Sequence, residues 1–287
     1  MKNNKTYSIG VDIGGTNMKS VLFDLEAREV MADYSLATPR DSLDHFLIML
    51  NALIEPLKEK ARKDRVKVKG IGIGLPGLVD FKNKKIIDTP NVPILEGINF
   101  AREFKPEGDL LVKLDNDTNC FLRAEVKIWA GQKYDNVYGI ILGTGIGGAW
   151  WINKEIYQGS HGAAGEPGRM IVNFAEPIEL EAAYHKLTQA NPASLAEEAY
   201  RGDELAQKSY KEIGQYLGLA FANIINLVDP QAIIIGGGLV ASSGLFLSEI
   251  KNNMKKYIMS PEAKKIKVLR SKLGEQAGAI GAALLIE

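Results

Sequence analysis

The stretch IGVDIGGTNMKSVLFD, residues 9–24, combines two apolar runs with a polar, glycine-containing interruption. The flanking runs IGV and SVLF are typical of buried strands. Between them stand the carboxylate of Asp12, a glycine pair and the polar residues Thr16, Asn17 and Lys19. Glycines in such a turn expose backbone N–H groups and let a bulky anion approach closely. A tight hairpin that only needs positive φ is the alternative explanation, so a single turn of this kind decides little.

Similar turns recur further along the chain. VYGIILGTGIGGAWWINKEIY (137–157) is a second interrupted hairpin, and AIIIGGG (232–238) is a strand that runs into a triple glycine. We interpret the two hairpins as equivalent parts of two related halves. Neither a Walker A motif nor a GxGxxG fingerprint fits the first or third turn, and a strand rather than a helix follows the second. Three glycine turns after apolar strands therefore favour phosphate binding over isolated tight turns.

Composition narrows the class of protein. The 287 residues, 46% of them apolar, can form one large domain or two smaller ones. Lys+Arg and Asp+Glu both total 35, so the neutral net charge gives no electrostatic reason to expect nucleic acid or an anionic membrane as partner. Cys120 is the only cysteine, which rules out an internal disulfide and favours a reducing compartment. With no signal-type apolar segment at the start of the chain, we expect a cytoplasmic location.

Strand and helix patterns alternate between and after these hairpins. Beyond the two hairpins and the strand before the triple glycine, strands are predicted at 29–38, 70–80 and 109–117, and helices at 41–62, 118–130, 203–228 and 277–286. Pro56 lies inside the first helical pattern, where proline kinks or shortens a helix, and Gly131 is the expected cap of the second. Hairpins mixed with crossover helices predict an α/β fold of two lobes with a cleft between them.

Carboxylates at strand ends beside the glycine turns indicate phosphoryl transfer. Asp12 stands directly before the first turn, and a carboxylate beside bound phosphates usually acts through Mg²⁺. Asp117 follows Asn116 at the end of another strand and at the start of a helix. It is a candidate base for an acceptor hydroxyl and equally a candidate helix N-cap. Glu166 and Arg169, in HGAAGEPGRM (161–170), either meet a ligand or form an incidental ion pair on an exposed loop.

Together these motifs resemble the ROK (repressor, open reading frame, kinase) family of sugar kinases, within the actin-like ATPase superfamily. The likeness covers nearly the whole chain through VDIGGTNMK, GIGLPGLVD, TPN, NDTN, LGTGIGG, GAAGEPG, LEAAY, IIIGGG and AGAIGAALL, in this order. It implies an actin-like (ribonuclease H-like) α/β fold with a central cleft. The small N-terminal lobe would comprise residues 1–116 plus 275–287 and the large lobe residues 117–274. A homodimer is usual among relatives.

The resemblance also implies roles for individual residues. Asp117 would be the catalytic base, and Asp12 would hold Mg²⁺ directly or through water. The implied sugar-binding residues are Gly77, Asn91, Asn116, Asp117, Glu166, Arg169 and Glu181. The implied ATP-binding residues are Asp12, Gly14, Gly15, Thr16, Asn17, Lys19, Gly143, Thr144, Gly145, Gly147, Gly236, Gly237 and Gly238.

One position departs from the family pattern. Many relatives carry, three residues after the glutamate equivalent to Glu166, a histidine that binds both sugar and a structural zinc; here that residue is Arg169. The cysteines that usually complete the zinc site are missing from residues 170–180, so we expect no zinc. Arg169 would then either donate to sugar hydroxyls or pair with Glu166 and shape the pocket.

The resemblance favours an ATP-dependent kinase that phosphorylates a glucose-type hexose at O6. A kinase for N-acetylmannosamine, another amino sugar or a glycoside is the alternative within the same class. A non-catalytic, sugar-sensing regulator is the competing class. Family repressors carry an N-terminal helix-turn-helix, whereas here the phosphate loop already begins by residue 12. Retention of Asp12, Asp117 and both phosphate loops argues against an inactive scaffold.

Overall fold

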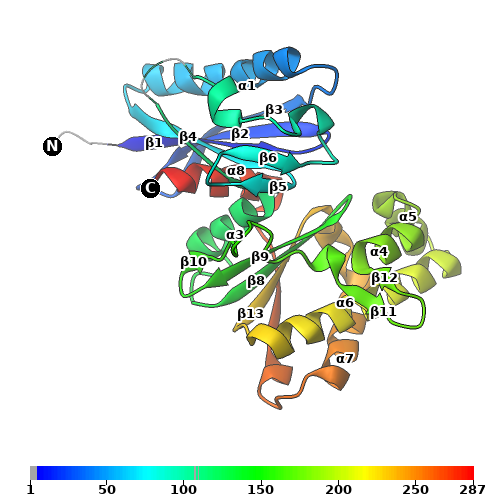
Figure 1. Ribbon diagram of the computed structural model, residues 1–287. Coiled ribbons are helices and arrows are strands. Elements are labelled where there is room, and N and C mark those ends of the chain that lie inside the picture. Colours follow the sequence, from blue (N-terminus) through cyan, green and yellow to red (C-terminus); the bar gives the residue numbers. More distant parts are fainter. Residues whose placement is uncertain (1–4, 107, 109) are drawn as a thin grey trace. The chain divides into compact units, whose positions relative to one another are not determined.

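The computed structural model describes residues 5–106, 108 and 110–287; residue 109, the expected start of a strand, lies outside this set. The described chain divides into two compact units (Figure 1). The first comprises the residues up to 132 together with 158–164 and 275–287, and the second comprises 133–157 and 165–274. Within the described residues each unit contains one five-stranded sheet and several helices, which confirms the predicted α/β class.

The sheet of the first unit begins with the hairpin of residues 9–24. β1 (Thr6–Ile13) pairs antiparallel with β2 (Asn17–Asp24), which pairs antiparallel with β3 (Glu29–Ala37). On the other side of β1, β4 (Lys67–Leu75) runs parallel to it, and β7 (Leu111–Asn116) runs parallel to β4. The order in the described sheet is therefore β3-β2-β1-β4-β7. Because β1 is the central strand of the sheet, the turn that follows it lies near the middle of the row of strand ends.

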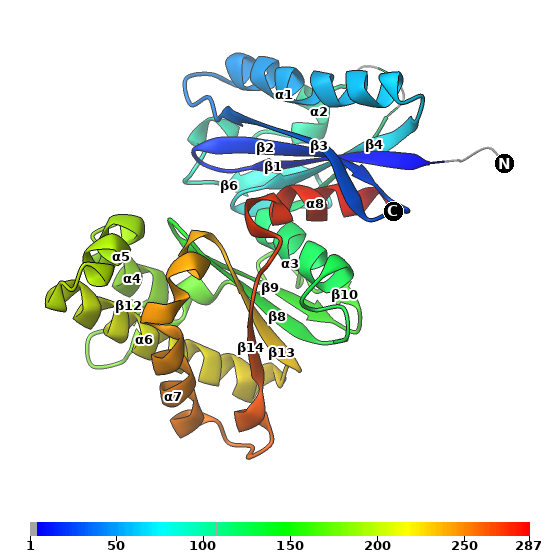
Figure 2. The same ribbon diagram turned by 180° about the vertical axis from the view of Figure 1, so that it is seen from behind.

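Helices cover both faces of this sheet (Figures 1 and 2). On one face, α1 (Leu43–Lys63) buries an apolar stripe that includes Phe46, Leu50 and Leu57. The helix continues through Pro56 and is not shortened there. On the other face, α8 (Ala277–Ala283) packs against β1 and β4, and all of its small side chains are buried. Small residues let the helix axis approach the strands closely.

α3 (Asp117–Ile128) belongs to the first unit because it packs against α8. The unit consequently extends to Gln132, beyond the boundary after residue 116 that the resemblance implied. α3 is capped at its C-terminal end by Trp129, two residues earlier than the expected cap at Gly131. The smaller elements of this unit are β5 (Leu78–Asp80), β6 (Lys85–Asp88), η1 (Pro93–Leu95), α2 (Phe100–Glu103) and η6 (Leu284–Ile286).

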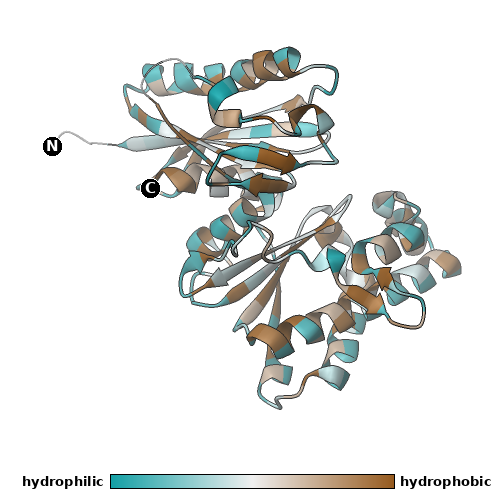
Figure 3. Cartoon of the chain, in the orientation of Figure 1, coloured by the Kyte–Doolittle hydropathy of each residue, from teal (hydrophilic) through white to brown (hydrophobic). Residues whose placement is uncertain are grey.

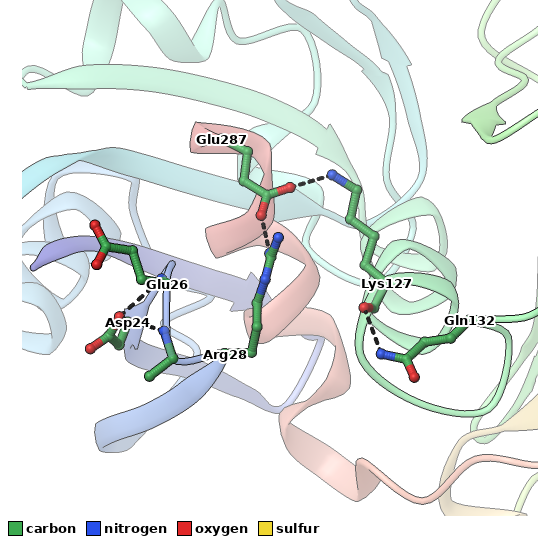
Figure 4. Close-up of polar contacts among 7 residues, drawn as sticks. Asp24, Glu26, Arg28, Lys127, Gln132 and Glu287 are labelled. Atoms are coloured by element: carbon green, nitrogen blue, oxygen red, sulfur yellow. Dashed lines mark hydrogen bonds and ion pairs between the residues drawn. The ribbon is translucent and has the colours of Figure 1, made fainter.

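Ion pairs hold the last residue of the chain in the first unit (Figure 4). The carboxylate of Glu287 pairs with Arg28, at the turn between β2 and β3, and with Lys127 of α3. At the same turn, Asp24 Oδ1 accepts hydrogen bonds from the backbone N–H groups of Glu26 and Ala27 at 3.0 and 2.9 Å. These contacts connect the sheet, α3 and the segment after α8.

The sheet of the second unit repeats the topology of the first. β8 (Val137–Leu142), β9 (Ile146–Ile152) and β10 (Glu155–Ile156) are successively antiparallel. β13 (Ala232–Gly236) runs parallel to β8, and β14 (Lys267–Arg270) runs parallel to β13. The order in the described residues, β10-β9-β8-β13-β14, matches that of the first sheet strand for strand. This supports the interpretation of the two hairpins as equivalent parts of related halves.

α6 (Glu204–Val228) is the longest helix of the second unit and agrees with the helix predicted over 203–228. It begins after Asp203, whose side chain accepts a hydrogen bond from the Ala206 N–H at 2.7 Å, and ends at Asp229, which adopts a left-handed conformation with φ of 48°. The other elements are η2 (Pro167–Arg169), β11 (Ile171–Asn173), β12 (Ile178–Glu179), α4 (Leu180–Thr188), α5 (Pro192–Tyr200), η3 (Gly238–Leu245), α7 (Leu247–Tyr257) and η4 (Ala263–Lys265). η5 (Gly274–Gln276) spans the boundary with the first unit.

Each unit has its own hydrophobic core, and the strands carry hydrophobic stretches in both (Figure 3). In the first unit, Ile9 and Ile73 of the sheet pack with Phe46 of α1. In the second unit, Ile140 and Ile233 of the sheet pack with helix residues. Within the part of the chain that the structure describes, no helix is both long enough and apolar enough to span a membrane.

Candidate active site

The turn between β1 and β2 is held by residues that follow β3. The Gly14 N–H donates to the Asn17 carbonyl at 3.0 Å, which closes the turn. Thr38 donates its hydroxyl to the Gly14 carbonyl at 2.7 Å and its N–H to the Thr16 carbonyl at 2.9 Å. Arg40 Nε donates to the Gly15 carbonyl at 3.0 Å. These bonds engage the carbonyls of Gly14, Gly15 and Thr16 and the N–H of Gly14. The N–H groups of the other residues of the turn are the natural partners for an anion.

Asp12 ends β1 directly before this turn, opposite Lys19 of β2 in the strand register. Its carboxylate lies against Gly278 of α8, where a β-carbon would come within 2.4 Å of Oδ2. Only glycine therefore fits at this position of α8. Lys19 forms an ion pair with Glu275 at 2.6 Å, just before α8. The strand, the helix and the lysine thus enclose the Asp12 carboxylate.

Asp12 and Asp117 are two carboxyl groups of the first unit whose pKa values are both raised, and the charge of Asp117 acts on Asp12. The pKa of Asp12 is raised to about 7, first by burial and then by the negative charge of Asp117, while Lys19 acts in the opposite direction. Burial also raises the pKa of Asp117 to about 6, against hydrogen bonds from the Thr118 N–H and hydroxyl that lower it. A cation placed here would offset both the desolvation and the mutual repulsion of these carboxylates. The pair has the oxygen donors that Mg²⁺ takes, usually from one or two carboxylates plus phosphates and water.

Asp117 is the first residue of α3, and the residue before it caps the helix. Asn116 Oδ1 accepts hydrogen bonds from the Thr118 and Asn119 N–H groups at 2.8 and 3.2 Å, so the N-cap is Asn116 rather than Asp117. Asn116 Nδ2 donates to the carbonyl of Gly77 at 3.0 Å. Gly77 stands in the turn between β4 and β5 with φ of 83°. The amide of Asn116 therefore fixes both the turn and the direction of Asp117.

Asp115, two residues before Asp117, is the centre of a buried network of hydrogen bonds and one ion pair. Sequence reasoning did not identify this network. Asp115 is 1% exposed and its Oδ2 forms an ion pair with Arg123 Nη2 at 2.6 Å. Its Oδ1 accepts hydrogen bonds from Asn119 Nδ2 at 2.8 Å and from Gln158 Nε2 at 3.3 Å. The only sequence signal was a charged residue at an inward position of the strand that carries Asn116. This network connects α3, β7 and the segment that starts at residue 158.

The other residue predicted for the sugar in the first unit, Asn91, is exposed and lies beside Gly15 of the turn. The structure thus brings the turn after β1, Asn91, Gly77 and the start of α3 into the same compact unit. The roles of these residues toward a sugar or a nucleotide stay predictions.

In the second unit, the turn between β8 and β9 is held by one helix. The Gly143 N–H donates to the Gly145 carbonyl at 3.0 Å. From α4, Tyr184 donates its hydroxyl to the Gly143 carbonyl at 2.7 Å, and His185 Nε2 lies 2.7 Å from the Thr144 carbonyl. Gly147 follows as the second residue of β9. Tyr184 and His185 were not predicted as site residues, although their spacing after Glu181 places all three on one helix face.

Glu181, predicted to bind sugar, has a contact within the protein. Its Oε2 accepts a hydrogen bond from the Ile146 N–H at 2.7 Å, at the end of the same turn. The third glycine turn follows β13: Gly236 ends the strand, Gly237 has φ of 86°, and Gly238 begins η3. A binding role for Glu181 or for these glycines stays a prediction.

Arg169 forms an ion pair with Glu179 of β12 at 2.9 Å, and its side chain is 70% exposed. Hydrogen bonding to Glu179 raises the pKa of Arg169, and the charges of Glu181 and Glu166 act in the same direction. Glu166 itself is exposed at the start of η2. Burial raises the pKa of Tyr138, and the charge of Glu166 adds to this effect. The carboxylate that the arginine pairs with is thus Glu179, a residue that sequence reasoning did not select.

Residues 170–180, in which the cysteines of the family's zinc site are missing, form the hairpin of β11 and β12. The hydrogen bond from the Leu180 N–H to the Met170 carbonyl at 2.8 Å closes this hairpin. Among residues 5–106, 108 and 110–287, no group of three or more His, Cys, Asp or Glu side chains is arranged to hold a metal ion. The absence of zinc stays a prediction.

Comparison with known proteins gives consistent matches over the whole length. The profile of the ROK family matches residues 8–181 and 178–287. N-acetyl-D-glucosamine kinase of Escherichia coli O1:K1 is 30% identical over 96% of this chain and 98% of its own. The xylose repressor of Bacillus subtilis (strain 168) is 27% identical over 98% of this chain and 77% of its own. A ROK family glucokinase from Streptomyces griseus, solved with glucose and AMPPNP, is 27% identical with a TM-score of 0.80, covering 97% and 98% of the two chains. The two mixed five-stranded sheets are thus those of the actin-like two-lobe fold, as predicted.

Proposed function

The chain belongs to the ROK family, and on this basis we propose that it is an ATP-dependent sugar kinase. It would transfer the γ-phosphoryl group of ATP to a hexose hydroxyl, with O6 of a glucose-type sugar as the favoured acceptor. A kinase for N-acetylmannosamine or another amino sugar is the alternative, supported by the 30% identity with N-acetyl-D-glucosamine kinase.

The observation that carries the proposal is the carboxylate pair of the first unit. Asp117 has a pKa of about 6, so it is mostly ionised near neutral pH and can accept a proton. Asp12, with its pKa raised to about 7, stands directly before the first glycine turn. A family member without catalysis has no need to keep two carboxylates in this costly, desolvated arrangement.

In the proposed reaction, Asp117 takes the proton of the acceptor hydroxyl as its oxygen attacks the γ-phosphorus of ATP. The bond between the γ-phosphorus and the bridging oxygen breaks, and ADP leaves. Asn116 keeps Asp117 in place through the helix cap and its bond to Gly77. The turn at Gly14, Gly15 and Thr16 and the turn at Thr144 and Gly145 would bind phosphates through backbone N–H groups. Mg²⁺, held by Asp12 directly or through water, would neutralise charge on the triphosphate.

The second candidate function is a non-catalytic regulator that senses a sugar. The likeness to a xylose repressor over 98% of the chain supports it. Such a protein would bind sugar without turning over ATP. The two candidate functions therefore differ in whether sugar-dependent ADP formation is observed.

A coupled ADP-release assay over a panel of hexoses and N-acetylhexosamines tests the proposal. We expect sugar-dependent ADP formation that requires Mg²⁺, stops with a chelator and is lost in Asp117→Asn. Asp33→Asn, at an exposed aspartate of β3, is the matched control and should keep full activity. Sugar binding without ADP formation for any sugar would support the regulator instead of the kinase.

Two further measurements test the expected zinc content and oligomeric state. Elemental analysis of protein purified without added metal should show well below one zinc per chain. Gel filtration with light scattering should give the mass of a homodimer.

A further inference from the structure

A cavity of about 420 Å³ opens in the first unit between the β5–β6 hairpin and residues 158–162. None of the residues that have a role in the proposed reaction lines this cavity. Its walls include Phe81, Lys82, Asn83, Gln158, Ser160 and His161. The volume falls in the range of about 300–1,000 Å³ that is typical of small-molecule sites.

The segments that carry both walls of the cavity are hydrogen-bonded to the residues around Asp117. The hairpin wall starts one residue after Gly77, whose carbonyl accepts from Asn116 Nδ2 at 3.0 Å. In the opposite wall, Gln158 Nε2 donates to Asp115 Oδ1 at 3.3 Å. Asp115 and Asn116 immediately precede Asp117 in the chain. Two hydrogen bonds therefore link the segments that form the cavity to the residues directly before Asp117, where the acceptor hydroxyl would meet its base.

The walls are held in place before any ligand binds. Asp80 Oδ1 accepts from the Asn83 N–H at 3.0 Å and Oδ2 accepts from Asn83 Nδ2 at 2.7 Å, which fixes the hairpin tip. These hydrogen bonds hold the pKa of Asp80 below its usual value. Opposite, a β-carbon at Gly162 would lie 2.7 Å from the Val79 carbonyl and 3.4 Å from the Phe81 ring, so the two walls touch. A preformed cavity loses little conformational entropy when a ligand enters.

The chemistry of the lining suits a carbohydrate. The partly buried ring of Phe81 offers an apolar face, and Lys82, Ser160 and His161 add polar groups at the exposed rim. A sugar ring has the matching combination of an apolar C–H face and hydroxyls at its edge. A phosphate group fits less well, because the ionised carboxylate of Asp80 stands in the same wall. The acyl group of an N-acetylated monosaccharide would fill only a small part of the volume of this cavity.

We propose that this cavity is a second acceptor subsite, which takes the outer glycosyl unit of a disaccharide or glycoside while the inner hexose lies at Asn116 and Asp117. This inference rests on the proposed function, because it assumes that the sugar lies beside Asp117. It extends the substrate class to acceptors larger than one hexose, with the inner hexose as the unit that is phosphorylated.

Titration calorimetry with disaccharides of glucose, mannose and N-acetylglucosamine, each against its own monosaccharide, tests the subsite. At least one disaccharide should bind about tenfold more tightly than its monosaccharide. Phe81→Ala should remove this advantage and leave monosaccharide binding within about twofold. Ser160→Trp, which fills the cavity from an exposed loop, should do the same without opening the core. Lys85→Ala, on the same hairpin but outside the cavity lining, is the matched control and should behave as wild type.

The subsite is refuted if no disaccharide binds better than its monosaccharide, or if both cavity variants weaken the two classes of sugar equally. The ADP-release assay, run on the same proteins, separates this from a failure of the proposed function. Phosphorylation of monosaccharides without any gain for disaccharides would keep the kinase and remove the subsite. Disaccharide binding that depends on Phe81 and Ser160, with no ADP release, would keep the subsite and remove the kinase.

Discussion

Glu181 Oε2 accepts a hydrogen bond from the Ile146 N–H at 2.7 Å, and this contact joins α4 to the turn between β8 and β9. Tyr184 and His185 of the same helix contact the carbonyls of Gly143 and Thr144. One helix face therefore fixes the backbone of the turn that is predicted to meet nucleotide phosphates. A turn that is ordered in advance binds its ligand with a smaller loss of conformational entropy.

Glu181→Ala should raise the KM for ATP, because it leaves the Ile146 N–H without its partner and loosens the turn. Loss of a hydrogen bond to a charged group is worth about 1.5–3 kcal/mol, or about ten- to a hundredfold in binding. Glu181→Gln keeps an acceptor oxygen and should have a smaller effect. The family resemblance instead implies that this glutamate binds the sugar. Steady-state kinetics with both substrates distinguish the two: a raised KM for the sugar with an unchanged KM for ATP would contradict the turn-fixing role.

Asp117→Asn should lower kcat by about 10²–10⁴-fold, the usual contribution of a general base, and should change sugar affinity far less. In the wild type, kcat/KM should rise with pH through about 6, because the pKa of Asp117 lies at about 6 and only the ionised form accepts a proton. The pH profile of the residual activity in the variant should lack this step. Near-normal turnover of Asp117→Asn would remove Asp117 from the catalytic role.

Asp12→Asn should stabilise the metal-free protein at alkaline pH. Burial raises the pKa of Asp12 from 3.8 to about 7, so the folded state holds this proton more tightly than the unfolded state does. The resulting stability is fully present below the unfolded pKa and is lost as pH rises through the folded pKa. The melting temperature of Asp12→Asn should therefore exceed that of the wild type at about pH 8, with a smaller difference at about pH 5. Asp33→Asn, as control, should follow the wild type; equal pH dependence of Asp12→Asn and wild type would refute the expectation.

Arg169→Ala should cost at most about 1 kcal/mol of stability, since the Arg169–Glu179 pair is largely exposed and such pairs contribute about 0–1 kcal/mol. If the arginine serves only this pair, Glu179→Ala should give the same small loss, and kcat/KM should change equally for every sugar. If Arg169 also donates to the acceptor, Arg169→His should change the ranking of sugars and Glu179→Ala should not. Kinetics over the sugar panel, together with melting temperatures, decide between the two roles.

Arg123→Met should destabilise the protein by about 3–5 kcal/mol, because it leaves the buried carboxylate of Asp115 without its charge partner. The double variant with Asp115→Leu should recover most of this loss, since apolar residues often replace a buried ion pair at little cost. Its kcat should nevertheless stay low if the network positions Asp117. A double variant with normal stability and normal kcat would show that the network is not needed for the reaction.

The sequence by itself determined the main hairpins, several of the helices and the class of the fold. Apolar runs on either side of a glycine turn predicted the hairpin of β1 and β2 and its counterpart at β8 and β9, and helical spacing predicted α1 and α6 with ends close to those observed. These features depend on residues near one another in the chain, where local periodicity and capping preferences act. The order of the motifs was likewise enough to identify the family that the profile matches.

Only the tertiary structure decided which partners the site residues have. Arg169 pairs with Glu179 rather than Glu166, Glu181 contacts the turn at Ile146, and Asn116 rather than Asp117 caps α3. The buried network at Asp115 joins strand, helix and a distant loop, and α3 lies in the first unit because it packs on α8. Side chains of one type look alike in a sequence, whereas their pKa values and hydrogen bonds depend on which distant segments bury them. That burial arises from packing between elements, and it is set by the fold as a whole.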